Sequence, residues 1–278
     1  MNDDFVGNYK RDGFCILKRI IPSEISQSVL DDIHQLFYLQ LGRFKKLGRF
    51  KKNVSSRGID NLYQDMQELL KCDVNAYLGA ARRAAKLIKL HHYLSHTTIL
   101  QMIEKLGIEI PTIVTEPVLH INSDKLVIPG GYVGFNTHQD WPSIQGSLDC
   151  VVVWAPLVEI TKNNYPLLVI PNSHKKGMCD GKITENLFEI DPKLYAQEDY
   201  ISVEVEPGDV VMMSSWTLHR TGIKDSHGFR ISCSTRYDNA AEPTFIDRGY
   251  PCAYQRSVNR ELITPSFPSQ EQVIKIFN

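Results

Sequence analysis

Three side chains in this sequence have the types and spacing to bind one metal ion. His138 and Asp140 stand two residues apart at the end of a strand-like run, and alternate residues of a strand point to the same face. His219 follows a second strand-like run, residues 210–218, and completes a set of two imidazoles and one carboxylate. On one face of a six-coordinate ion this set leaves three positions open, which suits non-haem Fe(II) and its oxygen chemistry.

An arginine strengthens this interpretation, because each motif is weak by itself. A His-X-Asp pair arises easily by chance in a chain with nine histidines, where it is most simply a hydrogen-bonded pair. Arg230 lies eleven residues after His219, on the next strand-like run. A guanidinium beside a metal can hold a carboxylate through two hydrogen bonds. A dicarboxylate cosubstrate would present such a carboxylate at its far end.

The elements that must position these residues change in character along the chain. Apolar residues at helical spacing predict helices over 25–37, 62–70, 74–90 and 99–106, with Ser23 as the N-cap of the first. Short runs rich in Val, Ile, Thr and aromatic residues predict strands at 112–121, 132–137, 148–156, 167–170, 201–205, 210–214 and 229–237. Glycine and proline turns separate these runs, which is typical of a β-sandwich or barrel.

The two parts are not separated by a linker-like stretch, so we interpret residues 1–278 as a single domain. The helical part covers about residues 1–110, the β core about 112–240, and a C-terminal extension 241–278. We expect the helices to pack on the β core.

Several motifs together resemble one known family. They are His138-Gln139-Asp140-Trp141, the turn Pro207-Gly208-Asp209, His219-Arg220-Thr221-Gly222, the downstream Arg230, the opening GFCILKRIIPSEI at 13–25 and LLVIPNSHKKG at 167–177. Over about residues 12–237 the sequence is similar to the phytanoyl-CoA dioxygenase family of Fe(II)/2-oxoglutarate oxygenases. The resemblance implies a mainly β fold, a double-stranded β-helix (jelly-roll, cupin-like) buttressed by N-terminal α-helices.

The resemblance also implies roles for single residues. His138, Asp140 and His219 match the iron ligands, and Arg230 matches the partner of the distal carboxylate of 2-oxoglutarate. Further cosubstrate contacts are expected from Thr221, Trp154, Asn122 and Lys125, and substrate contacts from Trp141, His120 and His174. The alternatives are core packing for Trp154, turn chemistry for Asn122 and Lys125, and a structural hydrogen bond for His174.

The activity implied is hydroxylation of an unactivated C–H bond with Fe(II), 2-oxoglutarate and O2, releasing succinate and CO2. Related halogenases have a small residue where this chain has the carboxylate of Asp140, so hydroxylation is expected and halogenation is not. The segment 162–166 departs from the family pattern, which leaves a natural-product, sugar-like or amino-acid-like small molecule open as substrate. The alternatives are a catalytically silent jelly-roll binding protein, an oxygenase of protein side chains, and a different metal with isomerase or lyase chemistry.

Composition and net charge limit the possible partners and the expected cellular compartment. Thirty-one Lys and Arg against 32 Asp and Glu give a net charge of −1, which argues against a nucleic-acid partner. The chain lacks an apolar run of about 18 residues, so a membrane partner is not expected. The polar N-terminus and six scattered cysteines predict a cytoplasmic protein with reduced thiols. The sequence leaves the oligomeric state open between a monomer and a dimer.

One oddity is the hexapeptide LGRFKK, which occurs at 41–46 and again at 47–52. It is interpreted either as a solvated loop or helix end or as a basic patch for an anionic substrate or surface. The polar stretch 172–200 is long enough to be a lid. We expect it, together with 41–59, to shape the choice of substrate.

Overall fold

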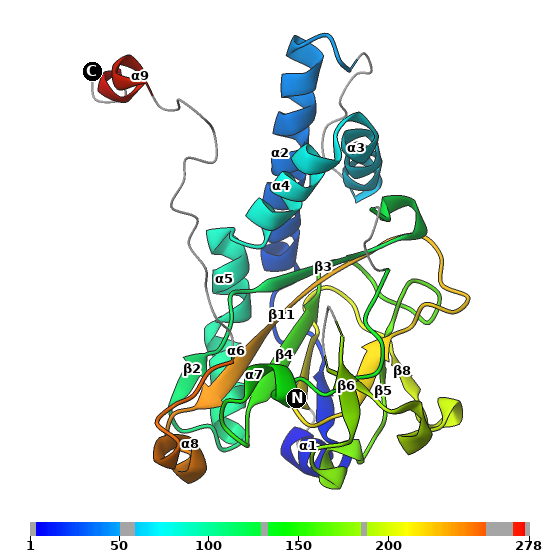
Figure 1. The fold of residues 1–278 in the computed structure, drawn as a ribbon, viewed down its shortest axis with the longest axis vertical. Coiled ribbons are helices and arrows are strands. Elements are labelled where there is room, and N and C mark those ends of the chain that lie inside the picture. Colours follow the sequence, from blue (N-terminus) through cyan, green and yellow to red (C-terminus); the bar gives the residue numbers. More distant parts are fainter. Residues whose placement is uncertain (1–3, 51–58, 129–132, 185–187, 254–268, 276–278) are drawn as a thin grey trace.

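The computed structural model describes residues 4–50, 59–128, 133–184, 188–253 and 269–275. Its first third is helical, as the sequence predicts, apart from one short strand, β1 (Phe14–Leu17). The helices are α1 (Phe5–Asp12), α2 (Ser23–Lys46), α3 (Ile59–Cys72), α4 (Val74–Ala84), α5 (Ile88–Leu94) and α6 (Thr97–Lys105). Figure 1 shows α2 to α5 gathered on one side of the large sheet.

The long helix α2 organises this layer. Val29, Ile33, Phe37 and Leu41 recur every four residues and are fully or almost fully buried, so they form one apolar stripe along the helix. Against this stripe pack α3, α4 and α5. Two details differ from the prediction: Ser23 is the first helical residue and makes no side-chain cap, and the helix expected over 74–90 is two helices.

The large sheet has six strands. Its order is β1–β9–β4–β11–β2, and β3 pairs with β11 beyond this path. The bounds are β2 (Pro111–Ile113), β3 (Val118–Asn122), β4 (Val151–Pro156), β9 (Val210–Ser214) and β11 (Arg230–Asn239). All the pairings are antiparallel.

The central strand β4 shows why this sheet lies between two layers. Val151, Val153 and Ala155 belong to the apolar cluster that includes the helices. Val152 and Trp154 belong to a second cluster, together with residues of the small sheet. Successive side chains of a strand point to opposite faces, so an apolar run without alternation is expected for a strand covered on both sides.

The small sheet closes the jelly-roll. It contains β10 (His219–Thr221), β5 (Leu167–Val169) and β8 (Ile201–Val203) in that order. A hairpin, β6 (Gly181–Ile183) with β7 (Phe188–Ile190), lies beyond it. His138 links the two parts, because its backbone pairs with His219 of β10 on one side and with Glu189 of β7 on the other. The fold is therefore the expected helix-buttressed double-stranded β-helix.

Three predicted elements are corrected by the structure. The strand expected at 112–121 is two strands, interrupted where Pro117 has no N–H to donate to the ladder. The run expected as a strand at 132–137 is irregular in its described part, 133–137. The stretch 172–200, expected as a loop, contains in its described part the β6–β7 hairpin and three 3-10 turns: η2 (Ser173–Lys176), η3 (Pro192–Leu194) and η4 (Gln197–Asp199).

The remaining elements are short. They are the 3-10 turn η1 (Asp124–Leu126) and the helices α7 (Trp141–Ile144), α8 (Pro243–Asp247) and α9 (Gln270–Ile274). None of the helices in the described ranges is both long and apolar enough to span a membrane. Cys15, Cys72, Cys150, Cys179 and Cys233 are free thiols.

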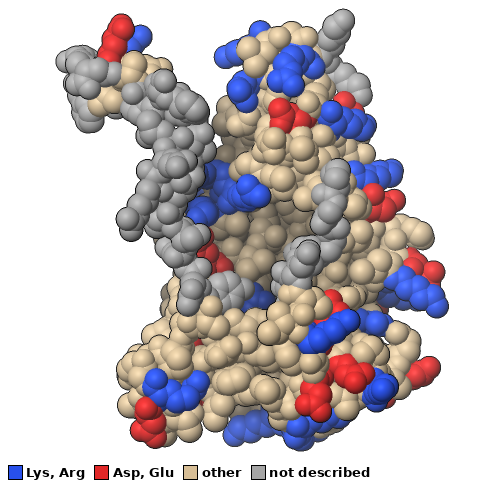
Figure 2. All heavy atoms as spheres, in the orientation of Figure 1, with Lys and Arg blue, Asp and Glu red and all other residues tan. Residues whose placement is uncertain are grey.

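The first LGRFKK copy forms the end of α2. Arg43, Lys45 and Lys46 are exposed there, whereas Phe44 is buried. Figure 2 shows Lys and Arg side chains gathered at this end of the molecule. The second copy begins in a turn at Leu47, and residues 51–52 lie outside the described residues.

Candidate metal centre and active site

The three predicted metal ligands meet in the interior of the jelly-roll. Nε2 of His138 lies 3.7 Å from Oδ1 of Asp140, and the rings of His138 and His219 have centroids 4.1 Å apart. One ligand atom from each residue lies within 4.8 Å of the others, and all three side chains are buried. The spacing and burial fit a single ion bound from one side.

Backbone pairing brings these residues together. His138 and His219 exchange two backbone hydrogen bonds, 3.0 and 3.1 Å long. The N–H of Asp140 donates to the carbonyl of Ser215, 2.9 Å away, which fixes the carboxylate just beyond the pair. The irregular segment before His138 thus gains its position from β10.

Both histidines have a defined ring orientation. Nδ1 of His138 donates to the Asn136 carbonyl at 2.7 Å, and Nδ1 of His219 donates to the Thr217 carbonyl at 2.9 Å. These bonds place the proton on Nδ1 and leave the lone pair of each Nε2 directed at the centre. An outer hydrogen bond of this kind typically orients a metal-binding imidazole.

The protonation states also suit a metal. Burial lowers the pKa of His138 to about 3, and the neighbouring His219 adds to the shift. Burial likewise lowers the pKa of His219. For Asp140 burial would raise the pKa, but the Arg236 guanidinium together with His219 and His138 outweighs burial and holds this pKa well below its usual range. Near neutral pH the cluster is therefore two neutral imidazoles and one carboxylate, the forms that bind metal.

Arg236 binds the metal-site carboxylate directly. Its Nη2 lies 3.2 Å from Oδ1 and 3.1 Å from Oδ2 of Asp140, and its Nε lies 3.3 Å from Oδ2. Its Nη1 donates to the hydroxyl of Ser234 at 2.9 Å. The guanidinium therefore fixes the plane of the carboxylate from the side of β11.

A cavity, which we call the inner cavity, opens beside the cluster. Arg230, Thr221 and Trp154 line it along with His138 and His219. Arg230 is 3% exposed, and its guanidinium carbon lies 5.8 Å from the centre of the Trp154 ring. The guanidinium also donates to the carbonyl of Tyr165.

The donor set of this cavity fits a dicarboxylate that reaches from the metal cluster to Arg230. The Thr221 hydroxyl oxygen accepts from the Phe135 N–H at 3.2 Å, which leaves its own proton available to donate. Arg230 supplies the positive charge. Val152, Leu167 and Met213 give the inner cavity an apolar wall.

Two further predicted residues lie close to this cavity. His120 lines it, and its Nε2 is 2.9 Å from the Ser234 hydroxyl. Asn122 is buried directly opposite Arg230 in the β3–β11 pairing, but its amide turns to the Val133 carbonyl and it is not among the residues that line the cavity.

Three predicted residues lie elsewhere, which corrects their expected positions. Lys125 is exposed in the turn η1. Trp141 stacks on Trp216 with ring centroids 4.7 Å apart, because α7 starts here and turns the side chain away from the inner cavity. Nε2 of His174 meets the Lys10 carbonyl at 3.2 Å, so this histidine packs where α1 meets β1, in a structural contact.

The sequence reasoning missed Arg236. A signal for it exists, because Arg230, Ser234 and Arg236 are all even-numbered residues of one strand and therefore share a face. Once β11 is recognised as continuous to Asn239, its second arginine must face the same interior as the first.

The fold and this cluster define a class of protein, the jelly-roll enzymes with a His-X-Asp…His metal site. A family model described as phytanoyl-CoA dioxygenase (PhyH) matches residues 9–232, and the chain belongs to this family. The family uses iron, 2-oxoglutarate and O2, and the donor set of the inner cavity fits these cofactors.

Comparisons with single proteins are more distant. The chain is 30% identical over 124 residues to the 1-deoxypentalenic acid 11-beta-hydroxylase of Streptomyces arenae, which is 41% of this chain and 42% of that protein. The match thus spans less than half of that relative.

Two solved structures share the fold at low identity. The epimerase SnoN in complex with Fe3+, alpha ketoglutarate and nogalamycin RO superposes with a TM-score of 0.54 at 14% identity, over 86% of this chain and 83% of that one. The apo non-heme monooxygenase ThoJ superposes with a TM-score of 0.56 at 15% identity, over 85% and 77%.

Proposed function

We propose that this protein is an Fe(II)- and 2-oxoglutarate-dependent dioxygenase that hydroxylates an unactivated C–H bond of a small molecule, with release of succinate and CO2. The observation that carries the proposal is the buried cluster of His138, Asp140 and His219, whose two histidines line one cavity with Arg230. A natural-product, sugar-like or amino-acid-like molecule is the proposed class of substrate.

Each residue has a distinct task in this proposal. His138, Asp140 and His219 hold iron from one side, while Arg230 and Thr221 hold the distal carboxylate of 2-oxoglutarate. When bound, iron with 2-oxoglutarate and O2 supplies the oxidising power to break an unactivated C–H bond. The apolar wall of Val152 and Met213 excludes water from this chemistry.

The orienting contacts support the same assignment. The carbonyls that accept from Nδ1 of His138 and His219 keep both Nε2 atoms aimed at the ion. Arg236 keeps Asp140 ionised, so an anionic oxygen occupies the position that a halide needs in a halogenase. Hydroxylation is therefore the proposed outcome, and halogenation is not.

A silent binding protein is the competing interpretation. Loss of a ligand or of the buried arginine would favour it, but the chain retains all four residues. The intact cluster favours an enzyme.

The proposal is tested by an anaerobic titration. Fe(II) and 2-oxoglutarate are added to the metal-free protein, and the visible charge-transfer band of the chelate is recorded. His138→Ala should abolish the band, and Arg230→Ala should raise the 2-oxoglutarate concentration needed by roughly ten- to a hundredfold, the loss expected for hydrogen bonds to a charged group. Arg11→Gln, at an exposed ion pair far along the chain, is the matched control.

The outcomes separate the two interpretations. A band that is lost in His138→Ala and shifted in Arg230→Ala supports the site and justifies a screen of substrates by succinate release. Folded protein that binds metal but gives no band at saturating 2-oxoglutarate refutes the oxygenase and favours the binding protein.

A further inference from the structure

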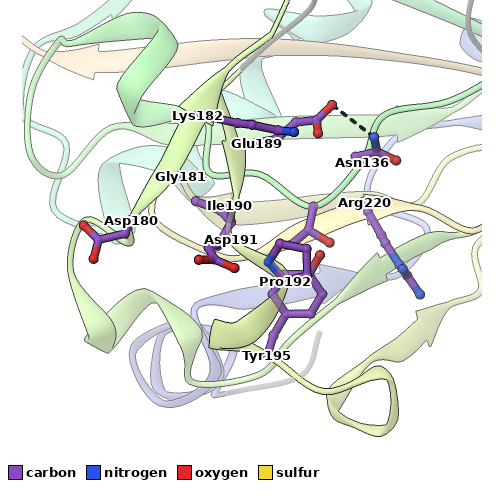
Figure 3. A pocket seen from close by; sticks show the side chains of 11 residues that line it. Asn136, Asp180, Gly181, Lys182, Glu189, Ile190, Asp191, Pro192, Tyr195 and Arg220 are labelled. Carbon is purple, nitrogen blue, oxygen red and sulfur yellow. Dashed lines mark hydrogen bonds between the residues drawn. The ribbon is translucent and has the colours of Figure 1, made fainter.

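A second, larger cavity lies between the β6–β7 hairpin and the segments that carry the two histidines. Its volume is about 590 Å³, within the range of small-molecule sites. We call it the outer pocket. Figure 3 shows its wall, with Lys182 and Glu189 from the hairpin, Asn136 from the segment before His138, and Arg220 from β10.

The outer pocket lies on the opposite face of the small sheet from the metal cluster. His219 and Thr221 line the inner cavity, and Arg220 between them lines both cavities. The Arg220 guanidinium lies over the ring of Tyr200, as expected for a side chain that alternates with its two neighbours. Thr137 precedes His138 and lies in the wall of the outer pocket by the same alternation. A molecule in this pocket would therefore contact the reverse side of both histidine-bearing segments.

Arg220 is the charged group that this pocket offers to a ligand. Its guanidinium stacks over the Tyr200 ring, 4.2 Å from the centroid, and the Tyr200 hydroxyl is held 2.5 Å from the Thr137 hydroxyl. The Nε of Arg220 is buried without a hydrogen-bond partner, and none of the ion pairs among the described residues includes this side chain. A half-buried cation of this kind usually has an anionic partner.

The acidic side chains of the pocket do not fill that role. Glu189 accepts from the amide of Asn136 at 3.0 Å, and Asp191 accepts from the Lys193 N–H at the start of η3. In Figure 3 the carboxylate of Asp180 points away from Arg220. The anion that Arg220 lacks within the described structure is therefore best supplied from outside.

The rest of the wall sets the shape of the ligand. Ile190, Pro192 and Tyr195 add apolar and aromatic surface to the wall of the pocket. Lys182, on the hairpin, is a second cation at the rim. We propose that the outer pocket binds a small organic anion, a carboxylate or phosphate attached to a compact apolar body, with Arg220 as its charge partner.

The proposal is tested with phenyl phosphate and benzoate, by isothermal titration calorimetry on the full chain without iron. The two probes share the apolar ring and distinguish a phosphate from a carboxylate as the preferred head group. Arg220→Gln should weaken the preferred probe by roughly ten- to a hundredfold. Lys182→Gln, at an exposed position, should weaken it by a few fold, and serves if the first variant does not fold. Arg11→Gln is the control for loss of a surface charge.

A further titration distinguishes binding in the outer pocket from binding in the inner cavity. Because Arg230 also attracts carboxylates, each probe is titrated into Arg230→Gln, which should keep its full affinity if the anion sits in the outer pocket. Binding that is lost in Arg230→Gln and kept in Arg220→Gln places the anion in the inner cavity and overturns the proposal. Absence of binding by both probes also overturns it. Neither result touches the proposed oxygenase, since iron is not involved.

Discussion

Replacement of Arg236 by glutamine isolates the contact that holds the metal-site carboxylate. The change removes three contacts of 3.1–3.3 Å to Asp140 and leaves a buried carboxylate without its cation. Breaking a buried ion pair on one side costs about 3–5 kcal/mol. At about 1.36 kcal/mol per pKa unit, this loss corresponds to a rise of about 2–4 units in the pKa of Asp140.

The effect of Arg236→Gln on stability is expected to depend on pH, because it acts through the pKa of Asp140. In the wild type the pKa of Asp140 is depressed, so the folded state gains stability above the ordinary carboxyl pKa and loses it only in strong acid. In Arg236→Gln the largest contribution that lowers this pKa is lost, so the pKa rises relative to the wild type and the stability gained on ionisation is reduced. The difference in unfolding free energy should be about 3–5 kcal/mol at pH 7 and should shrink as the pH falls toward 4.

Urea denaturation of the metal-free protein between pH 4 and 7 measures this difference. Arg236→Lys keeps the positive charge but loses the paired donors of the guanidinium. Its unfolding free energy should therefore lie between those of the wild type and Arg236→Gln. Arg11→Gln breaks an exposed pair and should cost less than about 1 kcal/mol at every pH. A wild type and Arg236→Gln that differ by less than about 1 kcal/mol at pH 7 would show that the pair does not hold the carboxylate.

Two other predictions concern neighbours of the cluster. Because the pKa of His138 is about 3 when folded and about 6.5 when unfolded, the unfolded state binds the extra proton between these values, and metal-free protein should lose about 2 kcal/mol of stability from this residue between pH 6.5 and 5. Urea midpoints at the two pH values measure the loss, and a His138→Gln variant with an equally steep dependence would contradict it. A Cβ on Gly134 would lie 2.6 Å from the Cβ of Thr221, so Gly134→Ala should cost about 1–3 kcal/mol and weaken 2-oxoglutarate binding. Thermal unfolding and the charge-transfer titration check this, and a variant unchanged in both refutes the close approach.

The sequence identifies the fold class well because the relevant signals are local. Apolar spacing finds the stripe of α2, and the unbroken apolar run of β4 is what a strand covered on both faces requires. The His-X-Asp motif and the later histidine carry their meaning in residue type. What local signals cannot supply is the pairing of His138 with His219, because it joins segments about eighty residues apart.

The features that the sequence did not predict have a common physical origin, because each depends on tertiary contacts. Apolar periodicity runs through the break between α4 and α5, so only the packing of Leu90 and Tyr93 shows where the chain turns. Trp141 is adjacent to a ligand in sequence, yet α7 carries its ring onto Trp216. Local spacing places Arg236 on the same face of β11 as Arg230, but its contact with Asp140 joins residues 96 apart and cannot be derived from local spacing.

The strand β11 sets the separation of Arg230 and Arg236, which lie toward opposite ends of the site. Arg230 and Arg236 lie six residues apart on one face, so at about 3.3 Å per residue their Cα atoms are about 20 Å apart. From one end Arg230 reaches into the inner cavity, and from the other Arg236 reaches to Asp140, with the metal cluster between them. Because the strand is paired on both sides, with β4 and β3 or β2, neither arginine can shift along the sheet independently of the other. In the proposed dioxygenase, the distance between the metal cluster and the arginine that binds the distal carboxylate would therefore be set by a rigid strand.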